Sequence, residues 1–194
     1  GTNNSYGKLV VNGGTIKSAG STTLNNSYAS STSTKYGTIE INGGTITTTA
    51  SQAVANSSAY GQIKVTGGTI TATGTSSSYG TIHNTKANTK IIVEGGTITK
   101  PNASYAICIA SGSNNTNTTI TGGDISTGSA TAVYNRGNGA TLIVGTEGAE
   151  SNTYPKLTGR ILGDVVSTGS GPITVHSGTI TATTSTAISS VNTS

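Results

Sequence analysis

The side chains able to do acid–base or nucleophilic chemistry are few in this chain and lie far apart. The carboxylates, imidazoles and thiol are Glu40, Glu94, Asp124, Glu147, Glu150, Asp164, His83, His176 and Cys108. A general acid and base need two carboxylates within several ångströms of one bond, and a metal ion needs closely spaced ligands. Glu147 and Glu150 lie together in one loop, and the other residues show no such spacing. We therefore expect no enzyme activity, no cofactor and no metal site.

Local patterns give these residues simpler roles. Glu40 alternates outward in a column whose next-coil neighbour is Lys64, which predicts an ion pair between coils. Glu94 falls in a different outward column, beside a glycine corner. His83 alternates outward in its strand and is expected to be exposed to solvent. Cys108 takes the same strand position as His83 and is expected to be an isolated free thiol.

The element that positions all of these residues is a repeat. One phrase recurs: alternating apolar residues, then Gly-Gly-Thr-Ile, then Thr or Ser. Its clear copies cover 9–16, 39–46, 63–70 and 91–98, and its weaker copies cover 120–125 and 173–180. The first glycine falls at positions 13, 43, 67, 95 and 122, which is a spacing of 24 to 30 residues. This period suits one coil of a solenoid.

Each phrase contains two short strands, because apolar residues alternate on either side of a glycine corner. Ile39, Ile41 and Ile46 should point inward, whereas Thr45 and Thr47 should point outward. The third strands are predicted at 24–26, 54–56, 82–84, 107–109, 133–135 and 188–190. Three strands per coil predict an all-β parallel helix of about seven coils. We treat 1–194 as a single solenoid domain, and as a piece of a longer repetitive protein.

Residues at the same place in successive coils should stack. The predicted asparagine ladder consists of Asn26, Asn56, Asn84 and, after a gap, Asn135. The predicted tyrosine stack consists of Tyr6, Tyr36 and Tyr60, each followed by Gly and expected to shield the corner from solvent. The predicted outward threonine array consists of Thr45, Thr47, Thr69, Thr71, Thr97, Thr99, Thr179 and Thr181. Thr is also a good small polar strand former, so the array has a purely structural explanation as well.

The phrase Ile-x-Ile-x-Gly-Gly-Thr-Ile-Thr resembles the repeats of adhesin-like right-handed parallel β-helix proteins of microbial cell surfaces. The wider superfamily includes pectate-lyase-like proteins and autotransporter passenger domains. The resemblance covers about Gly7 to Ser190. It implies a right-handed coil, an extracellular, cell-surface location and a stalk or attachment role. The Thr-x-Thr ranks are similar to those of ice-binding β-solenoids, in which methyl and hydroxyl groups order water.

Composition limits the partners. The chain has 39 Thr, 26 Ser and 17 Asn but no Phe, Trp or Met, so its core must be thin. The net charge of +4 comes from scattered residues, which argues against nucleic acid, and no apolar stretch is long enough for membrane insertion. The sequence predicts a rigid adhesin segment that contacts a surface glycan or protein.

The alternatives are an ice-binding solenoid, a carbohydrate-binding module and a self-assembling filament subunit. Unpaired strand edges at the terminal coils predict contact with neighbouring solenoid coils or end-to-end self-association. The inserted loop 146–156 is the largest departure from the repeat. Insertions are common binding sites in solenoids, so this loop is the first place where we would expect one.

Overall fold

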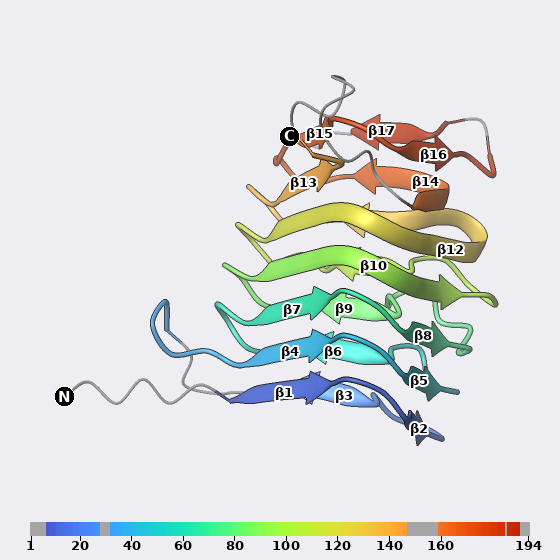
Figure 1. Ribbon diagram of the computed structural model, residues 1–194. Coiled ribbons are helices and arrows are strands. Elements are labelled where there is room, and N and C mark those ends of the chain that lie inside the picture. The colour runs from blue at the N-terminus through green and yellow to red at the C-terminus, as the bar shows by residue number, and fades with distance from the viewer. Residues whose placement is uncertain (1–6, 28–31, 147–158, 185, 191–194) are drawn as a thin grey trace.

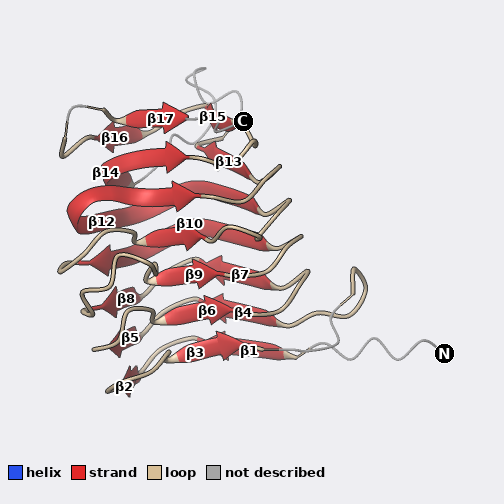
Figure 2. Cartoon of the chain, turned by 180° about the vertical axis from the view of Figure 1, so that it is seen from behind, coloured by secondary structure: helices blue, strands red, loops and turns tan. Residues whose placement is uncertain are grey.

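The structure is a computed structural model that describes residues 7–27, 32–146, 159–184 and 186–190. These residues form an all-β solenoid of about six turns, slightly fewer than the seven expected. Every pairing between its strands is parallel. The coils stack as successive levels, from β1–β3 near the N-terminus to β15–β17 near the C-terminus (Figures 1 and 2).

The strands form three sheets. The first sheet contains β1 (Lys8–Val11), β4 (Thr38–Ile41), β7 (Gln62–Val65), β13 (Thr141–Val144), β15 (Ile173–Val175) and the first parts of β10 (Lys90–Lys100) and β12 (Asn117–Asn135). The second sheet contains β2 (Thr15–Ser18), β5 (Thr45–Thr48), β8 (Thr69–Ala72), β16 (Thr179–Thr181), the end of β10, the middle of β12 and the start of β14 (Arg160–Ser167). The third sheet contains β3 (Leu24–Asn26), β6 (Val54–Asn56), β9 (Ile82–Asn84), β11 (Ile107–Ile109), β17 (Ile188–Ser190) and the last parts of β12 and β14.

The strands lie where alternation and glycine punctuation predict them, with two differences. β10 runs through the corner between the first and second sheets, and β12 passes round all three sheets as one strand. The end of β14, at 165–167, is a third-sheet strand without a counterpart in the predicted set, because the sequence before it departs from the repeat.

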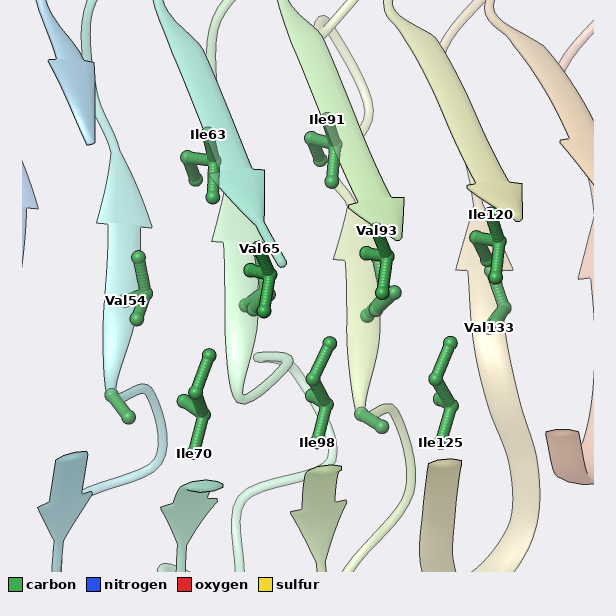
Figure 3. Close-up of a cluster of buried hydrophobic side chains, with 14 of the residues drawn as sticks. Val54, Ile63, Val65, Ile70, Ile91, Val93, Ile98, Ile120, Ile125 and Val133 are labelled. Atoms are coloured by element: carbon green, nitrogen blue, oxygen red, sulfur yellow. The ribbon is translucent and has the colours of Figure 1, made fainter. Parts of the chain in front are cut away.

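The core is a narrow column of branched aliphatic side chains inside the tube. Ile41, Val65 and Val93 are Cα partners on successive levels, and all three are 0% exposed. The second sheet adds Ile70, Ile98 and Ile125 in the same manner (Figure 3). Packing similar branched side chains at a constant spacing buries the inner levels almost completely, so a thin core stays continuous along the tube.

The corner between the first and second sheets needs glycine for two reasons. Gly44 has φ +86°, a left-handed conformation that L side chains adopt at a cost. A Cβ on Gly44 would also lie 2.8 Å from the backbone of Gly13 in the coil below. Gly68 and Gly96 repeat both features with φ values of +85° and +83°. The Gly-Gly pair therefore sets the close spacing of the coils as well as the direction of the chain.

Asparagines link the coils where the third sheet ends. Asn26 Nδ2 donates to Asn56 Oδ1 at 2.8 Å, and Asn56 Nδ2 donates to Asn84 Oδ1 at 2.8 Å. A Cβ on Gly61 would lie 2.1 Å from Asn56 Oδ1, so the Gly that follows Tyr60 makes room for the amide. Ile109 occupies the next position of this column, and Asn135 beyond it donates instead to the carbonyl oxygen of Ala140 at 2.8 Å.

Candidate functional site

The outer face of the second sheet carries two parallel ranks of threonine. Thr45, Thr69 and Thr97 are Cα partners on three successive levels. Thr47, Thr71 and Thr99 form the second rank on the same three levels. These six side chains are half-buried or exposed, since their neighbours in the ranks cover part of each one. The face thus presents methyl and hydroxyl groups at the constant spacing of parallel strands, about 4.8 Å.

Other residue types interrupt the second rank below these three levels and both ranks above them, while Thr15 continues the first rank one level down. Lys17 is the Cα partner of Thr47 on the level below, and Asp124 is the partner of Thr97 on the level above. Arg160 follows Asp124 in the first rank, and its Nε lies 3.4 Å from an Asp124 carboxylate oxygen. Leu162 occupies the second rank on the same level as Arg160. Thr179 and Thr181 follow on the next level, separated from the main array. The regular part of the face is therefore three levels high.

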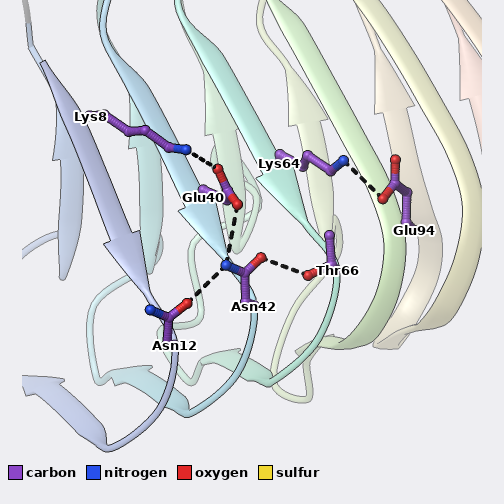
Figure 4. A network of polar contacts seen from close by, with 7 residues as sticks. All are labelled: Lys8, Asn12, Glu40, Asn42, Lys64, Thr66 and Glu94. Carbon is purple, nitrogen blue, oxygen red and sulfur yellow. Dashed lines mark hydrogen bonds and ion pairs between the residues drawn. The ribbon is translucent and has the colours of Figure 1, made fainter. Parts of the chain in front are cut away.

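The outer face of the first sheet is ionic, and its pairing differs from the predicted one. Glu40 and Lys64 are Cα partners, yet the Glu40 carboxylate pairs with the Lys8 ammonium at 2.6 Å. Lys64 pairs instead with Glu94 at 3.0 Å, although Glu94 was assigned to another column (Figure 4). The predicted partners were wrong because long side chains reach diagonally across the face. Lys8 is the Cα partner of Thr38, two residues before Glu40. Lys64 is likewise the Cα partner of Ile92, two residues before Glu94.

Hydrogen bonds extend this ionic face along the edge of the sheet. Asn42 Nδ2 donates to Asn12 Oδ1 at 2.9 Å and to Glu40 Oε1 at 3.2 Å, while Thr66 Oγ1 donates to Asn42 Oδ1 at 2.8 Å (Figure 4). The hydrogen bond from Lys8, followed by the one from Asn42, lowers the pKa of the Glu40 carboxyl. Both carboxylates are thus held as partners of cations on neighbouring coils, as in a surface ion-pair ladder.

A buried lysine lies at the corner between the second and third sheets. Lys100 is 0% exposed, and its ammonium donates to the carbonyl oxygens of Ser51 at 3.0 Å, Ser76 at 2.8 Å and Tyr79. Burial lowers the pKa of Lys100 to about 8. Three acceptors use all three N–H groups of an ammonium, so this side chain fastens loops of two other coils. The alternation of the strand could have revealed this burial from the sequence. If Ile98 points inward and Thr99 points outward, Lys100 must point inward as well.

His83 is buried, which corrects the expectation that it is exposed. Its side chain does point away from the core column, but only 3% of the residue is exposed. The Tyr79 ring meets the imidazole edge-on, with centroids 5.1 Å apart, and the backbone N–H of Gly80 donates to His83 Nδ1 at 3.3 Å. The loop that Lys100 fastens therefore covers this part of the third sheet. Burial, followed by the positive charges of Lys100 and Arg136, lowers the pKa of His83 to about 4.

Cys108 is the Cα partner of His83 on the next level and is fully buried. Burial raises the pKa of its thiol to about 11, so the thiol stays protonated at neutral pH. Tyr134 is the Cα partner of Cys108 on the next level, and its ring meets the Tyr105 ring at a tilt of 31°, with the centroids 4.7 Å apart. The Arg136 guanidinium carbon lies 5.6 Å from the Tyr134 ring centroid. Among the described residues, no three His, Cys, Asp or Glu side chains gather as metal ligands would.

Several predicted residues lie outside the described part of the chain, namely Tyr6, Glu147, Glu150 and all of the loop 146–156 apart from Thr146. Tyr36 and Tyr60 line one pocket at the corner before the first sheet.

Within the described residues, no helix has the length and apolar character needed to cross a membrane. No family model, no curated protein and no solved structure matches the chain.

Proposed function

We propose that this chain is a rigid structural segment of an extracellular, cell-surface adhesin. The in-register stacking of the three sheets carries this proposal, because each coil hydrogen-bonds to the next and shares one apolar column with it. A stack of this kind makes a rod that lengthens by about 4.8 Å per coil. Repetition along the rod also presents the same side chains many times, which suits weak multivalent contacts with a surface glycan or protein.

The pairing of charged groups fits a structural role. Lys8 with Glu40, Lys64 with Glu94 and Arg160 with Asp124 each join two coils. The proposal therefore assigns no catalytic step to these residues. It also predicts protease resistance, since backbone groups held in a parallel ladder are poor protease substrates compared with loops.

Limited proteolysis with a broad-specificity protease, followed by mass spectrometry, tests the spacer role. We expect cleavage sites in the loops and none within β4–β11 before the chain is denatured. Rapid cleavage inside these strands would contradict a rigid spacer.

Surface labelling of intact cells of the source organism tests the location. An antibody raised against the folded chain should stain cells without permeabilisation, and brief external protease treatment should remove the signal. Staining that requires permeabilisation would rule out the surface role and leave the fold untouched.

Ice binding is a second candidate, favoured by one observation, the two in-register threonine ranks of the second sheet. The matched test compares Thr71→Lys, in the middle of the second rank, with Thr119→Lys on the outer face of the first sheet. Thermal hysteresis that is lost in Thr71→Lys and kept in Thr119→Lys would support this candidate. Absence of hysteresis in the unaltered chain at millimolar concentration would remove it.

End-to-end association is a further part of the structural proposal. Leu9, Val175 and Ile188 are 42%, 42% and 43% exposed, although their Cα partners Ile39, Val144 and Val165 are buried. These side chains continue the core columns at the two ends of the described stack. Sedimentation should therefore reveal concentration-dependent association, which Leu9→Lys should weaken. A monomer at all concentrations would contradict it.

A further inference from the structure

One pocket lies along the corner at which the chain passes from the third sheet to the first sheet of the next coil. It has a volume of about 120 Å³, and it is lined by Ser33, Tyr36, Tyr60, Gln62, Asn88 and Lys90. Tyr36, Gln62 and Lys64 also line a neighbouring hollow of about 290 Å³ on the ionic face of the first sheet. The two hollows share Tyr36 and Gln62, so they form one uneven surface that combines aromatic rings, amides and cations.

The backbone of Tyr60 provides the first argument that this surface has a use. Tyr60 has φ +57°, in the left-handed region that bulky L residues rarely adopt. The residues at the same place in the next three coils, two positions before the first-sheet strand, are Asn88, Asn115 and Gly139, with φ values of +58°, +53° and +64°. Asn and Gly are the residue types that tolerate this conformation best. The backbone alone would therefore favour Asn at position 60, and the tyrosine ring needs a separate explanation.

The charges provide the second argument. Lys8 and Lys64 are neutralised by Glu40 and Glu94, as described above. Lys90 is exposed, lines the pocket, and makes no ion pair within the described residues. It is the Cα partner of Gln62, so a cation and a side-chain amide stand side by side on adjacent levels. The pocket therefore offers a positive charge next to hydrogen-bonding groups and an aromatic ring.

We propose that this pocket, the Tyr60 pocket, binds one acidic sugar unit of a polysaccharide, with the sugar ring against Tyr60 and its acid group near Lys90. The Gln62 and Asn88 amides can exchange hydrogen bonds with hydroxyl groups, and the apolar face of a sugar ring packs against an aromatic ring. This inference rests on the proposed surface role and names the chemistry of one contact. A pocket of this size buries little of a ligand, so a single site should bind with a dissociation constant on the order of 1 mM.

Titration of the full chain, followed by amide NMR shifts, tests the proposal with three probes of equal length. These are an oligogalacturonate, a sulfated heparin-type oligosaccharide and a neutral cello-oligosaccharide. At least one acidic probe should bind about tenfold more tightly than the neutral one, and should shift the amide signals of 60–62 and 88–90. Comparison of the two acidic probes shows whether a carboxylate or a sulfate is preferred, and added salt should weaken either interaction.

Three variants sharpen this test. Tyr60→Asn introduces the residue type found at the same position in the next two coils, Asn88 and Asn115, so this variant should fold normally. It should bind the acidic probe about tenfold more weakly. Lys90→Gln should remove the preference for acidic over neutral sugars. Lys17→Gln removes the same charge from the second sheet and should change nothing.

Equal binding of acidic and neutral probes, or unchanged binding by Tyr60→Asn, would overturn the proposal. Failure of every probe to bind would also overturn it. The spacer role would be unaffected by that result, because it is tested separately by limited proteolysis.

Discussion

The ammonium of Lys100 donates a hydrogen bond to the carbonyl oxygen of Ser76 at 2.8 Å, across a loop that leaves the coil below. Together with the carbonyls of Ser51 and Tyr79, this contact makes Lys100 a fastener between coils. The same loop carries Tyr79 over the imidazole of His83. The inward-pointing Lys100 thus holds in place the loop that covers His83 on the outer side of the third sheet.

Lys100→Met should destabilise the chain, because it keeps the buried stem but leaves three carbonyl oxygens without their donor. We expect a loss of about 2 kcal/mol in the free energy of unfolding, measured with urea. Amide exchange should rise most at residues 76–80. Lys86→Met, at an exposed lysine of the next corner, is the control and should change stability by less than about 0.5 kcal/mol. Equal effects of the two substitutions would show that the carbonyl contacts contribute nothing.

His83 should make the chain sensitive to acid. The pKa of His83 is about 4 in the folded chain and 6.5 as an ordinary value, so the unfolded chain binds more protons between these two pH values. Stability from this group is complete above pH 6.5 and falls as the pH drops, by about 3 kcal/mol at pH 4. His83→Ala should flatten the pH dependence in this window while lowering stability at neutral pH. An imidazole NMR signal that titrates near pH 6.5 would contradict the burial of His83.

Two glycine substitutions separate backbone strain from coil spacing. Gly14 and Gly44 have similar φ values, +79° and +86°, but a Cβ on Gly14 meets nothing within 4 Å, whereas one on Gly44 meets the backbone of Gly13 at 2.8 Å. Gly14→Ala should therefore cost about 1 kcal/mol, from the left-handed conformation alone. Gly44→Ala should cost roughly 3 kcal/mol, because the coils must also move apart. Equal thermal shifts for the two variants would mean that the close approach of the coils is not limiting.

Thr118→Val should stabilise the chain. Thr118 stands in the apolar column between its Cα partners Ile91 and Leu142, is 1% exposed, and has a hydroxyl oxygen without a hydrogen-bond partner in the described part of the chain. Replacing the hydroxyl with a methyl group removes the desolvation cost at nearly constant volume. The free energy of unfolding should rise by about 1 kcal/mol. Thr119→Val, at the half-buried neighbouring residue on the outer face, is the control and should have little effect on stability.

The strands and inward columns could be predicted from the sequence because they depend on local alternation and on glycine spacing. Ile41, Val65 and Val93 point inward for that reason, and the third strands start where the apolar residues do. The burial of His83 could not be predicted in this way. It depends on a loop folding over the outer face of a sheet, and nothing in the alternation around His83 reports on that loop.

Side-chain pairing was harder to predict than position. Glu40 and Lys64 lie on adjacent levels, but a long side chain reaches diagonally, and Lys8 is the cation that contacts Glu40. The Tyr60 pocket was also missed as a candidate site. The repeated Tyr-Gly pairs indicated a stack, whereas the contrast between Tyr60 and the asparagines of later coils emerges only from the backbone conformation they share.

The asparagine ladder has a direction. Each Nδ2 group donates to the Oδ1 atom of the following coil, so the amide dipoles of Asn26, Asn56 and Asn84 add head to tail along the tube. At the far end, Asn84 Nδ2 donates to the Lys86 carbonyl oxygen and to the hydroxyls of Thr89 and Thr116, so the series ends inside the stack. Aligned hydrogen bonds polarise one another, so this three-coil series has a donor end and an acceptor end, and the coils that it joins can stack in only one order if the series is to be kept.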